Sequence, residues 1–138
     1  MKPAWRFTWE SNWIHAPMAW WVHRPVDGQP GVFDPPVPPA VPHRGHAWLR
    51  VDCGGHEWVF SAPAQLDHAI EVLSRVPLPT SRALSAARGG GAGPNGHWLS
   101  RLPAAVKSPR ERTRHVQALR AVRGALQAAG GGWPPREA

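Results

Sequence analysis

Apolar and polar residues alternate at the start of the chain. Trp5, Phe7 and Trp9 are separated by polar side chains, which is the period of two typical of a strand with one buried face. A second run over 13–23 is also rich in Trp and Val, although Pro17 would confine it to a sheet edge or break it in two. The pattern predicts Trp-rich strands near the N-terminus.

The clearest local pattern is a β-hairpin. Two apolar-rich runs, 47–52 and 56–61, flank Gly54 and Gly55, and glycine readily supplies the positive φ of a two-residue turn. This turn sets the register of the two predicted strands, and with it one apolar face. In that register Val51 lies opposite Trp58, and Leu49 lies opposite Phe60.

After the hairpin, the apolar residues recur at the spacing of a helix. Ser61 is a candidate N-cap for a helix over 62–76, which Pro77 and Pro79 end. The apolar positions of this helix are Leu66, Ile70 and Leu73. A short helix is predicted after it, over 81–88.

The last predicted helix, over 109–129, has signals at both ends. Ser108 is a candidate N-cap, Pro109 occupies the first helical position, and Glu111 completes a capping box. Glycines at 130–132 end the helix. Its apolar stripe consists of Val116, Leu119, Val122 and Leu126, and its polar arc of Arg110, Arg120, Arg123, Gln117 and Gln127.

Strands followed by helices predict an α+β fold. We expect a small, mostly antiparallel sheet with the 62–76 and 109–129 helices packed on one face, joined by long Pro- and Gly-rich connections. The length suits one domain over 1–138. The segments outside these elements are a Pro-rich connector over 24–46, a Gly-rich loop over 89–96, and a tail over 130–138 that we expect to be disordered.

Two of these segments allow more than one interpretation. Proline favours extended polyproline II structure in the 24–46 segment, either as a stiff connector across the surface or as a docking peptide for an aromatic groove. The 89–96 loop is rich enough in glycine to cradle a phosphate, but it lacks both the Walker pattern and the GxGxxG spacing. A flexible loop is therefore the expected structure.

Positive charge is concentrated in the second half of the chain. Residues 1–70 hold five Lys or Arg against six Asp or Glu, whereas residues 71–138 hold eleven against three. Because self-repulsion destabilises the folded state, such a concentration indicates an acidic partner, and nucleic acid is the commonest one.

Arginine suits phosphate because its planar guanidinium donates paired hydrogen bonds and stays charged. We therefore predict a non-enzymatic protein that binds RNA or DNA, as an accessory subunit of a ribonucleoprotein or DNA-processing assembly. Trp98 is expected to stack on an unpaired base. The candidate phosphate-binding residues are Arg101, Lys107, Arg110, Arg112, Arg114, Arg120 and Arg123.

Alternatives to nucleic-acid binding stay open. The basic helix face also suits an acidic protein surface, or simply the solvation of a helix. A different function is that of a protein–protein interaction module, such as an inhibitor or adaptor in phage–host conflict. Such a module would use Trp20 or Trp21 and the Pro-rich segment, because tryptophan often dominates interfaces.

The histidines and the single cysteine raise the question of a metal site. His43 and His46 form one pair and Cys53 and His56 another, and two such pairs can close a tetrahedral zinc site. However, only six residues separate the pairs, and the predicted hairpin places the first pair away from the turn. We therefore expect no metal site and no cofactor.

Catalytic motifs are absent from the sequence. It contains neither a Gly-x-Ser-x-Gly elbow nor a His-Glu-x-x-His motif, so we expect no enzymatic activity. In an enzyme, Asp67, Asn95 and His97 would be the first residues to suspect. His68 also lies one helical turn from Glu71, which suits a local acid/base pair or, more commonly, a surface hydrogen bond.

The cellular setting follows from cysteine usage and hydropathy. A single cysteine excludes an internal disulfide and suits a reducing compartment. No segment has the continuous apolar length that a bilayer span requires. We expect a cytoplasmic protein without a membrane partner.

One stretch carries a resemblance. The residues over 93–103, Gly-Pro-Asn-Gly-His-Trp-Leu-Ser-Arg-Leu-Pro, are followed by Val106, Lys107 and the basic helix. This combination resembles a group of short uncharacterised proteins encoded in proteobacterial genomes, often on integrative elements and plasmids. The resemblance extends back through the hairpin and the 62–76 helix. It implies a mobile-element or host-conflict setting and no particular activity.

Overall fold

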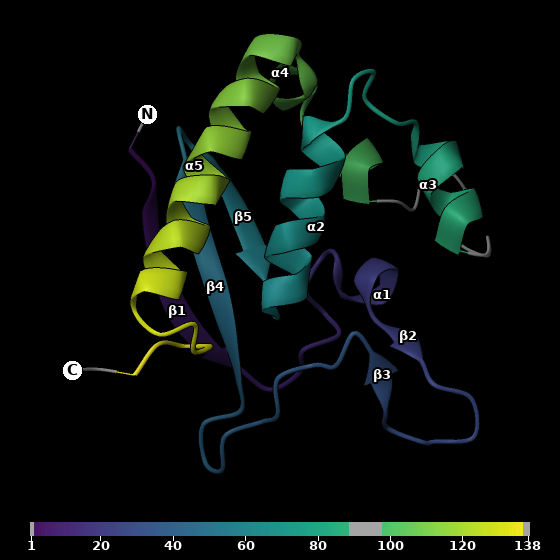
Figure 1. The fold of residues 1–138 in the computed structure, drawn as a ribbon, viewed down its shortest axis with the longest axis vertical. Coiled ribbons are helices and arrows are strands. Elements are labelled where there is room, and N and C mark those ends of the chain that lie inside the picture. Colours follow the sequence, from purple (N-terminus) through teal and green to yellow (C-terminus); the bar gives the residue numbers. More distant parts are fainter. Residues whose placement is uncertain (1, 89–97, 137–138) are drawn as a thin grey trace.

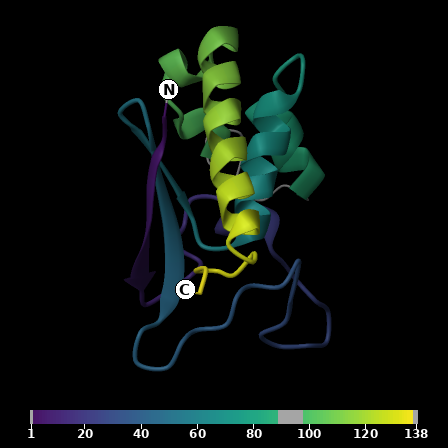
Figure 2. The same cartoon turned by 60° about the vertical axis from the view of Figure 1, so that its left-hand side comes forward.

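The computed structural model describes residues 2–88 and 98–136, which form a three-stranded antiparallel sheet with helices on one face (Figure 1). The sheet contains β1 (Ala4–Glu10), β4 (His46–Cys53) and β5 (His56–Phe60), in the order β1-β4-β5. The main covering helices are α2 (Pro63–Ser74) and α5 (Pro109–Ala128), and Figure 2 shows sheet and helices as two layers. The predicted α+β class is confirmed.

The hairpin of β4 and β5 has the predicted register. Leu49 pairs with Phe60 and Val51 with Trp58, and all four side chains are at most 2% exposed. β1 pairs with the other side of β4 and extends this apolar face, since Phe7 lies opposite Leu49. The alternation of apolar side chains therefore directs one face of the sheet toward the helices.

α2 and α5 pack side by side on that face and complete the core. Their buried apolar positions include the predicted Leu66, Ile70 and Leu73 of α2 and Val116, Leu119, Val122 and Leu126 of α5. Ser108 caps α5 as predicted, because its Oγ accepts a hydrogen bond from the N–H of Glu111 at 3.4 Å. The Glu111 carboxylate is directed to Arg114 rather than back to the N-cap.

The prediction that Ser61 caps α2 is wrong. The N-cap is Ala62, and no side chain caps the helix. Ser61 Oγ instead donates to the carbonyl oxygen of Trp13 at 2.8 Å, and the Ser61 N–H donates to Gln65 Oε1 at 2.9 Å. The hydroxyl thus holds the N-terminal segment against the start of α2, which a cap geometry would not allow it to do.

The prediction of a second Trp-rich strand over 13–23 is also wrong. This segment forms turns and a one-turn helix, α1 (Ala19–Val22). The N–H groups of Val22 and His23 donate to the carbonyl oxygens of Met18 and Ala19, each at 3.1 Å, which is the i to i−4 bonding of a helix and not of a strand. His23 Nδ1 also donates to the carbonyl oxygen of Pro35 at 2.8 Å. Burial against the connector, which no local pattern reveals, therefore decides the conformation of this segment.

The connector over 24–46 contains more regular structure than expected. Two short strands, β2 (Arg24–Pro25) and β3 (Phe33–Asp34), pair in an antiparallel ladder within it. Gly45 follows in a bridge to Val41 just before β4 begins. The connector is therefore not polyproline II along its whole length.

The prediction of a disordered C-terminal tail is wrong for its described part, up to Arg136, which packs on the sheet. The Trp133 ring contacts Phe7 edge-on, with 5.1 Å between the ring centroids. Trp133 Nε1 also donates to the carbonyl oxygen of Ala47 at 2.9 Å. A single aromatic side chain therefore anchors the segment after α5.

Among the described residues, three shorter helices lie between α2 and α5. α3 (Ser81–Arg88) confirms the predicted short helix, and the 3-10 helix η2 (Trp98–Arg101) and α4 (Ala104–Lys107) precede α5. The predicted Gly-rich loop over 89–96 lies outside the described residues.

Two hydrogen bonds between tryptophan and histidine connect elements that form this core. Trp58 Nε1 donates to His115 Nδ1 at 2.9 Å, and Trp98 Nε1 donates to His68 Nε2 at 3.1 Å. Because an indole N–H can only donate, each of these histidine nitrogens must be unprotonated. Burial lowers the pKa of both histidines, which favours the same neutral state.

We expect the free energy of unfolding to fall as the pH drops below about 6.5. The pKa of His68 and of His115 is lower in the folded state than in the unfolded chain, so protons bind preferentially to the unfolded chain. This contribution is complete above the unfolded pKa and is lost as the pH falls below it. Urea unfolding at pH 7.5, 6.5 and 5.5 measures the effect.

The control for this pH dependence is an exposed histidine. His115→Gln should flatten the dependence, whereas His43→Asn should leave it unchanged, because His43 lies at the surface. A stability of the unmodified protein that stays constant from pH 7.5 to 5.5 would contradict the prediction.

Gly45 and Gly124 form a matched pair for a second prediction. Gly45 has a φ of +97°, and a Cβ there would overlap the carbonyl oxygen of Glu10, whereas a Cβ at Gly124 in α5 meets open space. Gly45→Ala should therefore destabilise the protein by about 1 kcal/mol or more, and Gly124→Ala should stabilise it by about 1 kcal/mol. Urea unfolding of both variants tests this, and effects of the same sign would refute it.

Candidate nucleic-acid interface

α2 and α5, with the residues that directly flank them, carry most of the predicted basic surface. Over 63–75 and 107–128 the chain holds seven Lys or Arg and three Asp or Glu, a net charge of +4. The cations are Arg75, Lys107, Arg110, Arg112, Arg114, Arg120 and Arg123, and the carboxylates are Asp67, Glu71 and Glu111.

Three of the seven cations already have a carboxylate partner. The pairs are Glu71–Arg75, Glu111–Arg114 and Asp67–Arg123, with N–O distances of 2.7, 3.1 and 2.9 Å. Such exposed pairs stabilise a fold by only about 0–1 kcal/mol each, but they reduce the charge that the arginines present to a ligand. Within residues 2–88 and 98–136, Lys107, Arg110, Arg112 and Arg120 have no ion-pair partner.

The arginines of α5 do not share the single arc that the sequence suggested. Arg112, Arg120 and Arg123 reach across to α2 or to the residue that follows it. Arg110 is exposed on the other side of α5, and Arg114 bonds within α5 itself. The packing of α5 against α2 therefore divides one predicted basic surface into two.

A groove of about 420 Å³ runs between the end of α2 and the first half of α5. Arg112 Nη1 donates to the carbonyl oxygen of Arg75 at 3.3 Å, and Arg120 Nη2 donates to Ser74 Oγ at 3.4 Å. Both distances exceed the usual range for such bonds, so these contacts are weak. Both arginines also line the groove, and their positive charge is compensated by no carboxylate in the described part of the chain.

The groove around the two guanidinium groups is partly apolar. Arg112 Nε is buried and has no hydrogen-bond partner among the described residues. Val116 and Leu73 form apolar walls, and Val76, which is 92% exposed, lies at the rim. The groove therefore combines positive charge with room for a ligand.

Sequence reasoning did not identify the α2 side of this groove. Leu73 and Ser74 come from the end of α2, far from α5 along the chain. No local pattern connects them with the arginines, because the contact exists only once the two helices pack. The hydrophobic periodicity of both helices was the only available signal.

Arg101 is separated from the other predicted residues. It lies in η2 and lines a different cavity, beside β5. Lys107 is half-buried at the end of α4, and Arg110 is exposed in the first turn of α5. The structure thus brings together Arg112 and Arg120, with Arg110 and Lys107 near the start of the same helix.

Trp98 is placed in the core and not on the surface. It is 3% exposed, its ring centroid lies 6.5 Å from that of Trp58, and its Nε1 is bonded to His68. The predicted stacking of Trp98 on a base is therefore incompatible with this arrangement. Its large apolar ring packs in the core instead, as aromatic rings commonly do.

The candidate zinc ligands are not assembled. His43 and His46 lie at one end of β4 and Cys53 and His56 at the other, which separates the pairs by roughly 23 Å at 3.3 Å per residue. Burial raises the pKa of the Cys53 thiol to about 11, so it is not a thiolate at neutral pH. Among the described residues no group of three or more His, Cys, Asp or Glu is arranged to hold a metal ion.

The residues suspected of catalysis have other partners. Asp67 is paired with Arg123, and Asn95 and His97 lie outside the described residues. His68 accepts the hydrogen bond of Trp98, and Glu71 is paired with Arg75. The two members of the suspected acid/base pair are thus engaged separately.

The residues considered for protein binding are partly accessible. Trp20 is 38% exposed and its ring contacts that of Trp21 edge-on, with 4.5 Å between centroids. The prolines of the 36–39 segment line a cavity of about 340 Å³ opposite Trp13. This segment therefore faces another part of its own chain.

Two further observations concern membrane-spanning helices and similarity to known proteins. In the regions that the structure describes, no helix combines the length and the apolar character needed to cross a membrane. No protein-family model, no curated protein and no solved structure matches the chain.

Proposed function

We propose that the protein binds nucleic acid through its phosphates at the groove between α2 and α5. The observation that carries this proposal is the pair formed by Arg112 and Arg120, which line the same groove without a carboxylate partner in the described residues. Their present hydrogen bonds, at 3.3 and 3.4 Å, are weak enough to be exchanged for phosphate oxygens.

The geometry of α5 supports an anionic ligand in a second way. Pro109, the first residue of this 20-residue helix, also lines the groove. The N-terminus of a helix carries a partial positive charge, which favours phosphate there. Lys107 and Arg110 lie outside the groove but flank the same helix end, where they add positive charge.

The spacing of the two arginines suits a backbone and not a single phosphate. Arg112 and Arg120 are eight residues apart, which is about 12 Å along the helix axis. That distance corresponds to roughly three to four base steps of duplex DNA. Contacts between arginine and phosphate orient a protein on nucleic acid but do not recognise its base sequence. We therefore propose binding that is largely independent of base sequence.

This activity would suit a non-enzymatic accessory subunit of a ribonucleoprotein or DNA-processing assembly. The proposal does not depend on the type of nucleic acid, because no exposed aromatic ring has to stack on a base. Arg114 and Arg123 have smaller parts in it, since their carboxylate partners would have to be displaced first.

The test is the salt dependence of oligonucleotide binding. Fluorescence anisotropy with labelled random 20-mers, as duplex DNA and as single-stranded RNA, should give an affinity that falls steeply with salt concentration. Arg112→Ala/Arg120→Ala should weaken binding and lower the slope of log K against log salt by about 2 for duplex DNA, since two phosphate contacts are lost.

Arg82→Ala/Arg136→Ala is the matched control, because it removes the same charge away from the groove. Binding and salt slope should stay close to those of the unmodified protein. Equal losses in both double variants would mean that net charge alone is responsible. Binding that is absent or insensitive to salt would refute the proposal itself.

A further inference from the structure

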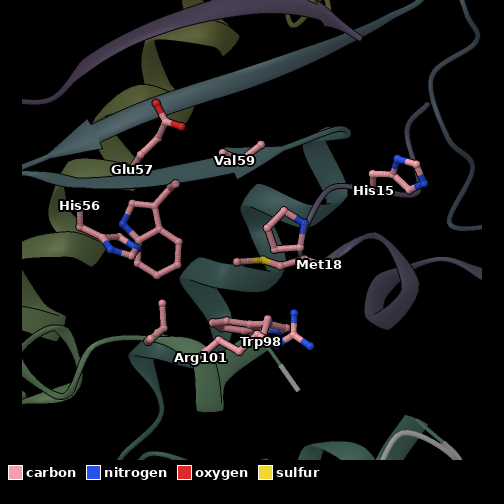
Figure 3. A pocket seen from close by; sticks show the side chains of 10 residues that line it. His15, Met18, His56, Glu57, Val59, Trp98 and Arg101 are labelled. Carbon is pink, nitrogen blue, oxygen red and sulfur yellow. The ribbon is translucent and has the colours of Figure 1, made fainter. Parts of the chain in front are cut away.

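A second cavity, of about 280 Å³, follows the open edge of β5 (Figure 3). It lies between β5, the segment that leads into α1, and η2, on a part of the molecule that the α2–α5 groove does not include. Met18, Trp58 and Leu102 supply apolar walls. Ligand pockets usually measure about 300–1,000 Å³, so this cavity suits one large side chain better than a whole small molecule.

The backbone of β5 borders the cavity with free hydrogen-bonding groups. β5 is the outer strand of the sheet, and its two-residue turn makes Cys53–His56 a hydrogen-bonded pair. Pairs then alternate along the hairpin, so the N–H and C=O groups of Glu57 and Val59 point outward. Within the described chain no hydrogen bond from another segment reaches these four groups.

The charge beside this edge is positive. Glu57 borders the cavity with its backbone, but its carboxylate lies on the outer face of the sheet, 2.9 Å from Arg50 and 3.9 Å from Arg6. Figure 3 shows this side chain directed away from Met18 and Trp98. Arg101 is exposed at the cavity and has no ion-pair partner in the described residues. A ligand that carries a carboxylate would therefore complement the charge of Arg101.

We propose that the β5 edge and its cavity bind an extended acidic peptide of a partner protein by strand addition. Glu57 and Val59 offer the peptide up to four backbone hydrogen bonds, which give affinity without regard to sequence. An apolar side chain of the peptide enters the cavity over Met18 and Trp58, and a neighbouring carboxylate pairs with Arg101. This site is independent of the proposed nucleic-acid groove.

A random dodecapeptide library displayed on phage provides the probe. Selection against the full-length protein should enrich peptides that combine an apolar residue with an acidic residue and lack proline between them. The affinity of an enriched synthetic peptide is then measured by fluorescence anisotropy. Failure to enrich any peptide that binds in solution would overturn the proposal.

Two variants locate the binding. Val59→Pro removes the outward N–H but no bond to β4, since this N–H is not part of the hairpin ladder. It should weaken binding at least tenfold, whereas Val59→Thr, which keeps the N–H, should not. Arg101→Glu should also weaken binding at least tenfold, and it serves as the test if Val59→Pro does not fold. Equal affinities for the unmodified protein and Arg101→Glu would show that the peptide binds elsewhere.

Two further measurements distinguish peptide binding at this edge from binding at the α2–α5 groove and from self-association. Arg112→Ala/Arg120→Ala should bind the peptide normally, so failure of nucleic-acid binding and failure of peptide binding can be told apart. Light scattering should find a monomer. A dimer that Val59→Pro converts to a monomer would assign the edge to a second copy of the chain and overturn the proposal.

Discussion

The register of the β4–β5 hairpin is the constraint on which the rest of the structure depends. The tight turn at Gly54 and Gly55 directs Leu49 and Val51 toward the helices. Because side chains alternate along a strand, a slip of one residue would bring Arg50 into the core instead. The same register decides which backbone groups of β5 point away from the sheet. One short turn therefore determines both the face that the helices cover and the edge that stays open.

The docking of α5 determines which of its arginines are neutralised as well as which apolar side chains are buried. To bury its stripe against the sheet and α2, the helix must bring the arginines that border the stripe against α2. There Arg123 meets Asp67 and is neutralised, whereas Arg112 and Arg120 meet only a carbonyl oxygen and a hydroxyl. The count of basic residues in the sequence thus overstates the charge available to a ligand, and their position after packing is the better guide.

Local patterns were sufficient where short-range geometry decides the structure. The hairpin register, α2, α3 and α5 follow from a glycine turn, helical periodicity and end signals. Local patterns were insufficient where a side chain could make more than one kind of contact. Ser61 could cap a helix or hold the N-terminal segment, and Trp98 could stack on a base or fill the core. In both cases the long-range contact prevailed, because it buries apolar area or satisfies a buried polar group.

The sequence by itself determined the α+β class, the apolar faces and the excess of positive charge in the second half of the chain, since each depends on spacing along the chain. Only the tertiary structure decided which charges remain unpaired, that Trp98 is buried, and that β5 lies at an open edge beside Arg101. These properties depend on groups that meet only after folding, and no local periodicity encodes which distant carboxylate or carbonyl a given arginine will reach.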